Sequence, residues 1–386
     1  MLIKWPGGKD QEYNLVKPFI PVFDTYVEPF FGSGAIFFNM KPHRSLLNDI
    51  NDKLMRIYML VQSRSSEFEE TINAYVTFWE KMDEVTQLLQ PSLLELYDTI
   101  RDEPMSSLQL KQLVSNSANV HKAIACDYLQ GFFGDVSLLW ATIIASLQSK
   151  WVRLPKLERD NNVRFDRLLM MSHLETAVRG GFYTYLRDVH IAKSAVEDAV
   201  VFYFLREFCY GSMFRFNKDG KFNIPYGGIA YNRKNFRAKA ARLFSEETRQ
   251  HFQHAQLTAL DFRTFFKRHW DILSPDTFCF LDPPYDTEFS AYDNMSFTMD
   301  DQRALSRLFA KLPCKSMLIV KDTESILNLY REARCENSNI QIARYDKTYT
   351  YNTRGRNIRD VQHLVICNYK LMDPNLFPEC NPLELL

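Results

Sequence analysis

The sequence has no excess of charge of either sign, no long apolar run and no clustered cysteines. Its 47 basic and 47 acidic residues cancel, so any surface for a polyanion has to be local. No stretch reaches the roughly 18 to 20 apolar residues of a membrane helix, and the N-terminal MLIKWPGGK lacks the apolar run of a signal peptide. The seven cysteines are dispersed, without a C-x-x-C pair or a neighbouring histidine cluster, which predicts reduced thiols and no zinc site. We therefore expect a cytoplasmic protein without a metal.

The 386 residues suffice for one large domain plus an insertion or a second domain. Short apolar runs alternate with turn signals in residues 25–62 and indicate strand, helix, strand, helix. This order is typical of a parallel sheet joined by right-handed crossovers. Further strands are predicted at 277–281, 316–320, 340–345 and 361–367, the first of them apolar throughout. The predicted fold is α/β: a Rossmann-like, mostly parallel sheet flanked by helices.

Residues 64–193 have a different pattern. Apolar residues recur at steps of three or four from Phe68 to Leu89 and again from Val136 to Leu147, which is the period of a helix. Turn residues separate these pieces, and no motif among them points to chemistry. We interpret 64–193 as a large helical insertion, so that residues 1–63 and 194–386 form a single α/β domain.

A glycine turn is the first candidate binding site. EPFFGSG (residues 28–34) follows a predicted strand and precedes a helix, and its glycines let backbone approach a nucleotide-like ligand. Asp49, at the end of the next strand, is placed to accept hydrogen bonds from ribose hydroxyls. The chain lacks a G-x-x-x-x-G-K-[ST] loop and a full G-x-G-x-x-G, which favours an adenosyl ligand without phosphates, such as S-adenosylmethionine. Taken alone, the glycines fit a plain turn better.

LDPPY (residues 281–285) is the candidate catalytic loop. Pro283 and Pro284 fix φ and remove two backbone donors, which leaves a stiff loop after an apolar strand. The Asp282 carboxylate and the Pro283 carbonyl together can hold both hydrogens of an exocyclic amine, and Tyr285 can stack on an extruded base. The motif therefore predicts methyl transfer to the amine of a planar base. Its structural alternative is a rigid turn with a solvated aspartate.

KWPGGK (residues 4–9) is a third signal. Trp5 offers a surface for stacking or packing, and the Lys9 ammonium can meet a carboxylate. An N-terminal turn with Trp5 in the core would explain the same residues.

The order KWPGGK, VEPFFGSGAIFFN, NDIN, FRFNKDGKFNIPYG and LDPPY closely resembles the Dam-type DNA adenine-N6 methyltransferases. The resemblance covers about residues 1–62 and 195–370. It implies S-adenosylmethionine as the cofactor and a flipped adenine in duplex DNA as the substrate. By this resemblance, the catalytic residues are Asp282, Pro283, Pro284 and Tyr285, and the residues that contact or border the cofactor are Trp5, Lys9, Glu28, Pro29, Phe30, Gly32, Gly34, Asp49, Asp261, Phe262 and Asp282.

Two departures from the family pattern matter. The interval between Asp49 and Phe214 is longer than the family needs, so the helical insertion is extra. The pattern around Arg354 also diverges, which puts in doubt its family role in shaping the pocket for the target base.

A basic, aromatic segment is the candidate DNA-binding surface. Residues 221–245 contain six basic side chains, no acidic one and several aromatics, and a second basic group lies around 344–359. A solvated basic face is the alternative for either group. Residues 212–245 are predicted to recognise the target. The predicted DNA contacts are Arg215, Asn217, Lys221, Arg233, Lys234, Arg237, Arg354 and Arg356.

Three alternatives stay open on the residues alone. A cytosine amine would satisfy the same two acceptors, so cytosine-N4 methylation competes with adenine-N6 methylation. A non-catalytic DNA-binding protein could retain the fold, although the KWPGGK, glycine-turn and LDPPY motifs are intact. The insertion could dock a protein partner, as in a restriction-modification system, and we expect the free chain to be a monomer.

Overall fold

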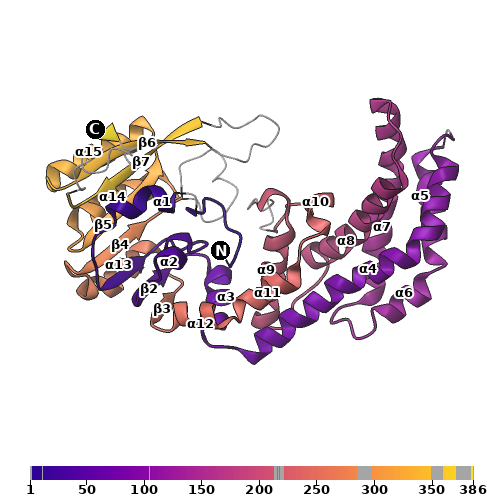
Figure 1. Cartoon of the computed structure of the whole chain (residues 1–386), viewed down its shortest axis with the longest axis horizontal. Helices are drawn as coiled ribbons and strands as arrows, with labels where there is room; N and C mark the ends of the chain where they lie inside the picture. Colours follow the sequence, from indigo (N-terminus) through magenta and orange to yellow (C-terminus); the bar gives the residue numbers. More distant parts are fainter. Residues whose placement is uncertain are drawn as a thin grey trace. The chain divides into compact units, whose positions relative to one another are not determined.

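The computed structural model describes residues 2–10, 12–103, 105–212, 215, 217, 221–284, 297–348, 360–370 and 384–385. The chain forms two compact units, both drawn in Figure 1. The first, here the sheet unit, comprises Met1–Ser63, Phe214–Lys221 and Ser245–Leu386. The second, the helical unit, comprises Arg64–Met213 and Phe222–Phe244.

The described part of the sheet unit contains a mixed sheet of eight strands. The strands are β1 (Thr25–Glu28), β2 (Arg44–Asn48), β3 (Ala255–Thr258), β4 (Thr277–Leu281), β5 (Lys315–Lys321), β6 (Gln341–Thr348), β7 (Asp360–Cys367) and β8 (Glu384–Leu385). Their order is β3-β2-β1-β4-β5-β7-β6-β8. The first five are parallel neighbours, whereas β7 runs antiparallel to β5 and β6, and β8 antiparallel to β6. The α/β fold is confirmed, but the sheet is mixed, because β6 and β7 pair as antiparallel neighbours.

Helices follow the strands along the chain and flank the sheet (Figure 1). They are α1 (Tyr13–Val16), α2 (Ala35–Met40), α3 (Asp52–Gln62), α12 (Glu246–Phe252), α13 (Phe262–His269), α14 (Met299–Lys311) and α15 (Glu324–Glu336), with short 3-10 turns η1 (Lys17–Phe19) and η3 (Trp270–Ile272). Side-chain caps begin several of them: Asn51 accepts from the Leu54 amide at α3, and Asp261 from the Arg263 amide at α13.

The sheet core is apolar and rich in aromatic rings. All five residues of β4 are buried, as a strand covered on both faces requires. Phe265, Phe309 and Tyr330 from the flanking helices pack into a buried cluster with strand residues such as Leu281 and Leu318. Burial of such side chains is the main stabilising contribution to the fold. Much of the high aromatic content is thus in the core.

The helical unit is built from long amphipathic helices. They are α4 (Ser66–Ile100), α5 (Ser107–Asn119), α6 (Lys122–Tyr128), α7 (Val136–Asn161), α8 (Arg167–Asp188), α9 (Ala195–Phe208), η2 (Tyr210–Ser212), α10 (Ile229–Asn232) and α11 (Phe236–Leu243). A Cβ on Gly181 of α8 would lie 2.5 Å from the Ile143 Cα of α7, so glycine permits the close approach of these two helices. None of the described helices has the length and apolarity that crossing a bilayer requires.

The helical unit contains more of the chain than the periodicity of 64–193 indicated. It includes α9 to α11, which the sequence interpretation assigned to the α/β domain. Aromatic packing explains this grouping, since the Phe204 ring of α9 lies 5.4 Å from Trp79 of α4 and 5.5 Å from Phe182 of α8.

Candidate functional site

The carboxyl ends of three parallel strands carry three carboxylates. Glu28 ends β1, Asp49 follows β2, and Asp282 follows β4. Because these strands are neighbours, their carboxyl ends meet at one edge of the sheet. β1 and β4 also flank the point where the strand order reverses, which is the usual ligand site of such sheets.

Lys9 and Asp282 form a partly buried ion pair. The Lys9 Nζ lies 2.7 Å from Oδ1 and 2.8 Å from Oδ2 of Asp282, and it also donates to the Gly7 carbonyl at 2.9 Å. Asp282 retains 19% exposure while Lys9 retains 3%. Burial raises the pKa of Asp282 and the Lys9 ammonium opposes that rise. The carboxylate that meets Lys9 is therefore the one in the LDPPY motif.

The loop after β4 is held by a side chain that the motif search missed. Gln302 of α14 is fully buried and donates through Nε2 to the Pro284 carbonyl at 3.1 Å. Pro283 is buried and Pro284 exposed. Tyr285 lies outside the described residues. An amide one turn into a helix, with no motif around it, gives no signal in the sequence.

Asp49 is bound to the glycine turn. It accepts from the Gly32 amide at 2.8 Å and from the Asn51 amide at 2.9 Å. Burial raises its pKa to about 6 against these two hydrogen bonds. Asn48, fully buried and missed by the sequence reasoning, donates to the carbonyls of Pro29 and Leu260, and so joins the ends of the neighbouring strands.

The glycine turn needs its glycines for conformation and for packing. Gly32 and Gly34 have φ of +50° and +66°. A Cβ on Gly32 would lie 2.9 Å from Cδ1 of Trp5, and one on Gly34 would lie 2.6 Å from the Phe31 ring. The half-buried Trp5 therefore packs directly on the turn, which brings KWPGGK and EPFFGSG together.

Glu28 completes the acidic group. It is 3% exposed and accepts from the Tyr26 hydroxyl at 2.8 Å. Burial raises its pKa well above the usual value, and Asp282 and Asp49 add to that rise. Among the described residues, neither Glu28 nor Asp49 has an ion-pair partner.

An aromatic group lies beside the carboxylates. The Phe30 ring lies 5.7 Å from those of Phe262 and Phe297, which are 5.6 Å apart. Phe297 was not among the predicted site residues, although it lies within residues 195–370, over which the family resemblance extends. Asp261 caps α13, and its carboxylate is 38% exposed. Such rings suit a flat, apolar ligand surface.

The described candidates for DNA contact differ in their exposure and in whether they form an ion pair with an acidic side chain. Arg215, Asn217, Lys221 and Arg233 are exposed. Arg237 is exposed as well, but its guanidinium donates to both oxygens of Glu80, at 2.9 and 2.5 Å. Arg354 and Arg356 lie outside the described residues.

Lys234 is more deeply involved in the helical unit than the sequence indicated. Its Nζ donates to the Glu207 carbonyl at 2.6 Å and lies 3.6 Å from the centre of the Tyr231 ring. The Glu207 carboxylate lies 3.5 Å away. These contacts use much of its capacity to bind a phosphate.

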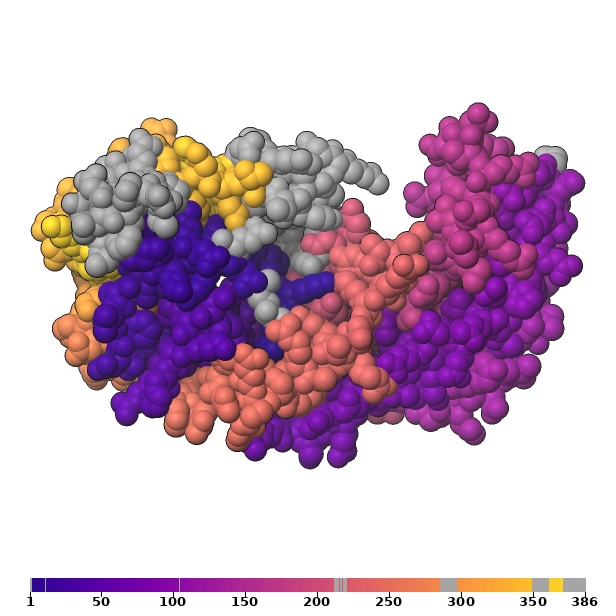
Figure 2. Space-filling model, in the orientation of Figure 1, coloured from indigo at the N-terminus to yellow at the C-terminus, as the bar shows by residue number. Residues whose placement is uncertain are grey.

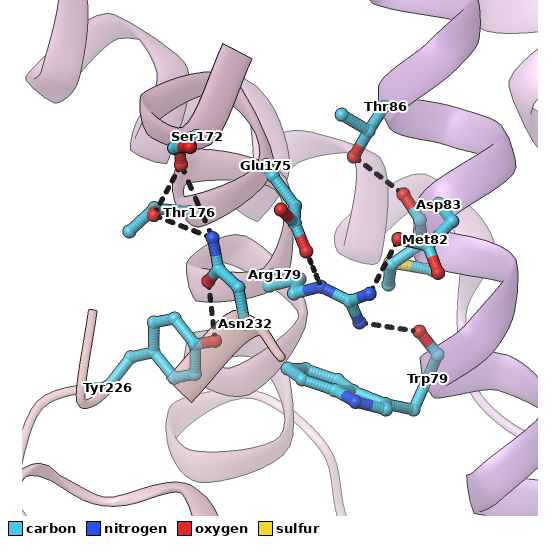
Figure 3. A network of polar contacts seen from close by, with 10 residues as sticks. All are labelled: Trp79, Met82, Asp83, Thr86, Ser172, Glu175, Thr176, Arg179, Tyr226 and Asn232. Atoms are coloured by element: carbon cyan, nitrogen blue, oxygen red, sulfur yellow. Dashed lines mark hydrogen bonds and ion pairs between the residues drawn. The ribbon is translucent and has the colours of Figure 1, made fainter. Parts of the chain in front are cut away.

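A buried polar network fixes the middle of the basic segment 221–245 on α8 of the helical unit (Figure 3). Asn232 of α10 donates to the Ser172 carbonyl at 3.3 Å and to the Thr176 hydroxyl at 3.0 Å, and it accepts from Tyr226 at 2.9 Å. Beside it, Arg179 reaches Asp83, Glu175 and the Trp79 carbonyl. The chain that continues from Asn232 into α11, drawn in salmon, forms part of the molecular surface (Figure 2).

Comparison with known proteins gives one family. The family model described as D12 class N6 adenine-specific DNA methyltransferase matches residues 5–132 and 141–350, and thus also spans most of the helical unit. A Type II methyltransferase, M.CviBI, from Paramecium bursaria Chlorella virus NC1A is 30% identical over 45% of this chain and 62% of the relative. A DNA adenine methylase of Vibrio cholerae is 23% identical over 92% of this chain and 91% of the relative. The retron Ec67 DNA adenine methylase of Escherichia coli is 26% identical over 57% and 78%.

Proposed function

The chain belongs to the D12 class N6 adenine-specific DNA methyltransferase family, and we propose that it uses S-adenosylmethionine to methylate adenine at a specific site in duplex DNA. Family membership makes it an enzyme that acts on DNA and selects adenine-N6 over cytosine-N4. The observation that carries the finer proposal is the Asp282 carboxylate, paired with Lys9 at the sheet edge where Glu28 and Asp49 also lie.

The residues at this edge fit such a cofactor. S-adenosylmethionine supplies an electrophilic methyl group on a cationic sulfonium. Glu28 and Asp282 would hold its ammonium, and Asp49, with acceptor capacity beyond its two backbone hydrogen bonds, would hold ribose hydroxyls. Trp5 and the glycine turn would form one wall and the rings of Phe30 and Phe262 another, with Asp261 at its border.

Asp282 and Pro283 act on the target amine. The lone pair of an exocyclic amine is conjugated with the ring, so the nitrogen needs help to become nucleophilic. The Asp282 carboxylate and the Pro283 carbonyl each accept a hydrogen bond from the amine and favour its rehybridisation, while the Gln302 hydrogen bond to Pro284 keeps the loop in place. Tyr285 stacks on the flipped base in this proposal.

Recognition of DNA falls to residues 212–245 and the basic group near the C-terminus. Among the described candidates, Arg215, Asn217, Lys221 and Arg233 are exposed and suited to phosphate or base contacts. Lys234 and Arg237 contribute less because acidic partners already neutralise them. Arg354 and Arg356 complete the proposed set.

The proposed organisation is a methyltransferase domain at 1–63 and 194–386 with a helical insertion at 64–193. Helices α4 to α8 all lie within the insertion, and their packing with α9 to α11 supports a role in presenting the target-recognition segment. A protein partner on the insertion, a monomeric free state, a restriction-modification setting and a cytoplasmic location stay predictions.

The function is tested by tritiated methyl transfer from S-adenosylmethionine to duplex DNA, followed by digestion to nucleosides. We expect label in N6-methyladenine, and recovery of N4-methylcytosine would overturn the assignment. Asp282→Asn should lower transfer by about 100-fold or more while DNA binding is kept. Asp276→Asn, an exposed change at the other end of β4, is the matched control and should leave transfer unchanged.

A further inference from the structure

Glu12 is a buried carboxylate that no motif contains. It immediately precedes α1, three residues after Lys9, and is 5% exposed. Its Oε1 accepts from the Tyr345 hydroxyl at 2.9 Å and lies 3.3 Å from Nδ1 of His363. Lys347 Nζ lies 3.5 Å from the same oxygen. A buried charge is tolerated only with such partners, so strands β6 and β7 hold this carboxylate firmly.

The antiparallel pairing of β6 and β7 places the two side chains that contact Glu12 next to each other. Tyr345 and His363 are direct register partners, and the Tyr345 hydroxyl lies 3.1 Å from the His363 Nδ1. They are 3% and 1% exposed. The two side chains therefore sit side by side on the sheet and meet Glu12 from a part of the chain more than 300 residues away.

Lys9 lies between two carboxylates. Its Nζ is 3.9 Å from Oε2 of Glu12 and 2.7 Å from Oδ1 of Asp282. Asp282 can present its remaining lone pairs to a substrate amine only if the ammonium keeps its place. Resting on the proposed function, we propose that Glu12, held by Tyr345 and His363, is a positioning residue for methyl transfer that fixes Lys9 against Asp282.

The charges around this group have defined effects. Burial alone would raise the pKa of Glu12, but His363, Lys9, Lys347 and Tyr345 together lower it to about 2, so it stays ionised. Lys9 and His363 lower the pKa of Asp282, whereas Glu12 raises it. The nearby Glu28 carboxyl faces the same edge. Removal of the Glu12 charge alone would lower the pKa of Asp282, whereas displacement of Lys9, which has the larger effect, would raise it.

The helical unit offers a matched control. Glu197 is likewise buried and lies between a tyrosine and a histidine: it accepts from the Tyr75 hydroxyl at 3.2 Å, and its Oε1 lies 3.1 Å from the His190 Nε2. Glu197→Gln removes a buried carboxylate charge that, like that of Glu12, has a tyrosine and a histidine as partners. Glu197 contacts neither Lys9 nor Asp282.

The test compares Glu12→Gln and Glu197→Gln in the full-length protein. Methyl transfer to duplex DNA gives kcat, KM and their pH profiles, and thermal unfolding gives stability. We expect Glu12→Gln to lower kcat by about 10- to 100-fold with KM for DNA little changed, because Lys9 is misplaced. Its acidic limb should move to higher pH, because loss of the Lys9 contact raises the pKa of Asp282 by more than loss of the Glu12 charge lowers it. Glu197→Gln should change only the unfolding temperature. A Glu12→Gln enzyme with wild-type kcat and pH profile would overturn the proposal.

A second readout does not depend on activity. The pKa of Asp282 is followed by carbon NMR of protein labelled at aspartate carboxyls, with Asp282→Asn for assignment. A rise in this pKa on Glu12→Gln supports the proposal even if the wild-type protein methylates no DNA, a result that would sink only the proposed function. No change or a fall in the pKa means that Lys9 keeps its place against Asp282 and contradicts the proposal. If Glu12→Gln does not fold, Tyr345→Phe removes one hydrogen bond from Glu12 and should lower kcat in the same way, and an unchanged kcat in that variant contradicts the proposal.

Discussion

At the scale of single residues, two opposing effects determine the pKa of the Asp282 carboxylate. Burial raises its pKa, while Lys9 lowers it through a short ion pair. A carboxylate with raised pKa is a better proton acceptor, and an ion pair keeps it oriented. Both properties suit a group that holds the hydrogens of an amine during methyl transfer.

Lys9→Met should shift the pH dependence of transfer in the same direction as Glu12→Gln. Without the ammonium, burial is unopposed and the pKa of Asp282 rises. Activity that needs the ionised carboxylate is then lost at a higher pH as the solution is acidified. The pH profile of kcat measures this, with Lys17→Met, an exposed change in η1, as the control. An acidic limb that stays in place would show that Lys9 does not set the ionisation of Asp282.

At the scale of elements, a polar anchor fixes the basic segment. The short helix α10 has four residues and cannot be stable alone, so its place depends on the hydrogen bonds of Asn232 to α8 (Figure 3). The anchor is buried, so loss of one member leaves other polar groups unsatisfied.

Asn232→Ala should destabilise the protein by about 1 to 3 kcal/mol, because the Thr176 and Tyr226 hydroxyls lose a buried partner. Denaturant unfolding measures the change. Asn73→Ala, an exposed substitution on α4, should stay within about 0.5 kcal/mol. Equal effects of the two substitutions would mean that the network contributes little.

At the scale of the whole molecule, a neutral chain has to bind a polyanion through local charge. The charges balance overall, and the basic segment 221–245 is partly neutralised by Glu80 and Glu207. Exposed cations such as Lys221 and Arg233 should therefore dominate the salt dependence of DNA binding.

Arg233→Ala should reduce the slope of log K against log salt by about 1, since an exposed arginine that contacts a phosphate releases one counterion. Arg237→Ala should change the slope less, because its guanidinium is already paired with Glu80. Binding titrations of duplex DNA at several salt concentrations compare the two. A larger loss for Arg237→Ala would show that DNA displaces Glu80.

The sequence by itself determined the elements and the family, and it predicted the site. Short apolar runs bounded by turn signals predicted β1 and β4, the helical period predicted the helices of 64–193, and LDPPY after a buried strand gave the candidate catalytic loop, because these signals are local in the chain. Only the tertiary structure decided which distant groups meet. The antiparallel pairing of β6 and β7 brought Tyr345 and His363 to Glu12, and helix packing paired Arg237 with Glu80. Such partners lie more than 150 residues apart, and what joins them is strand order and helix packing, which no local pattern of residues encodes.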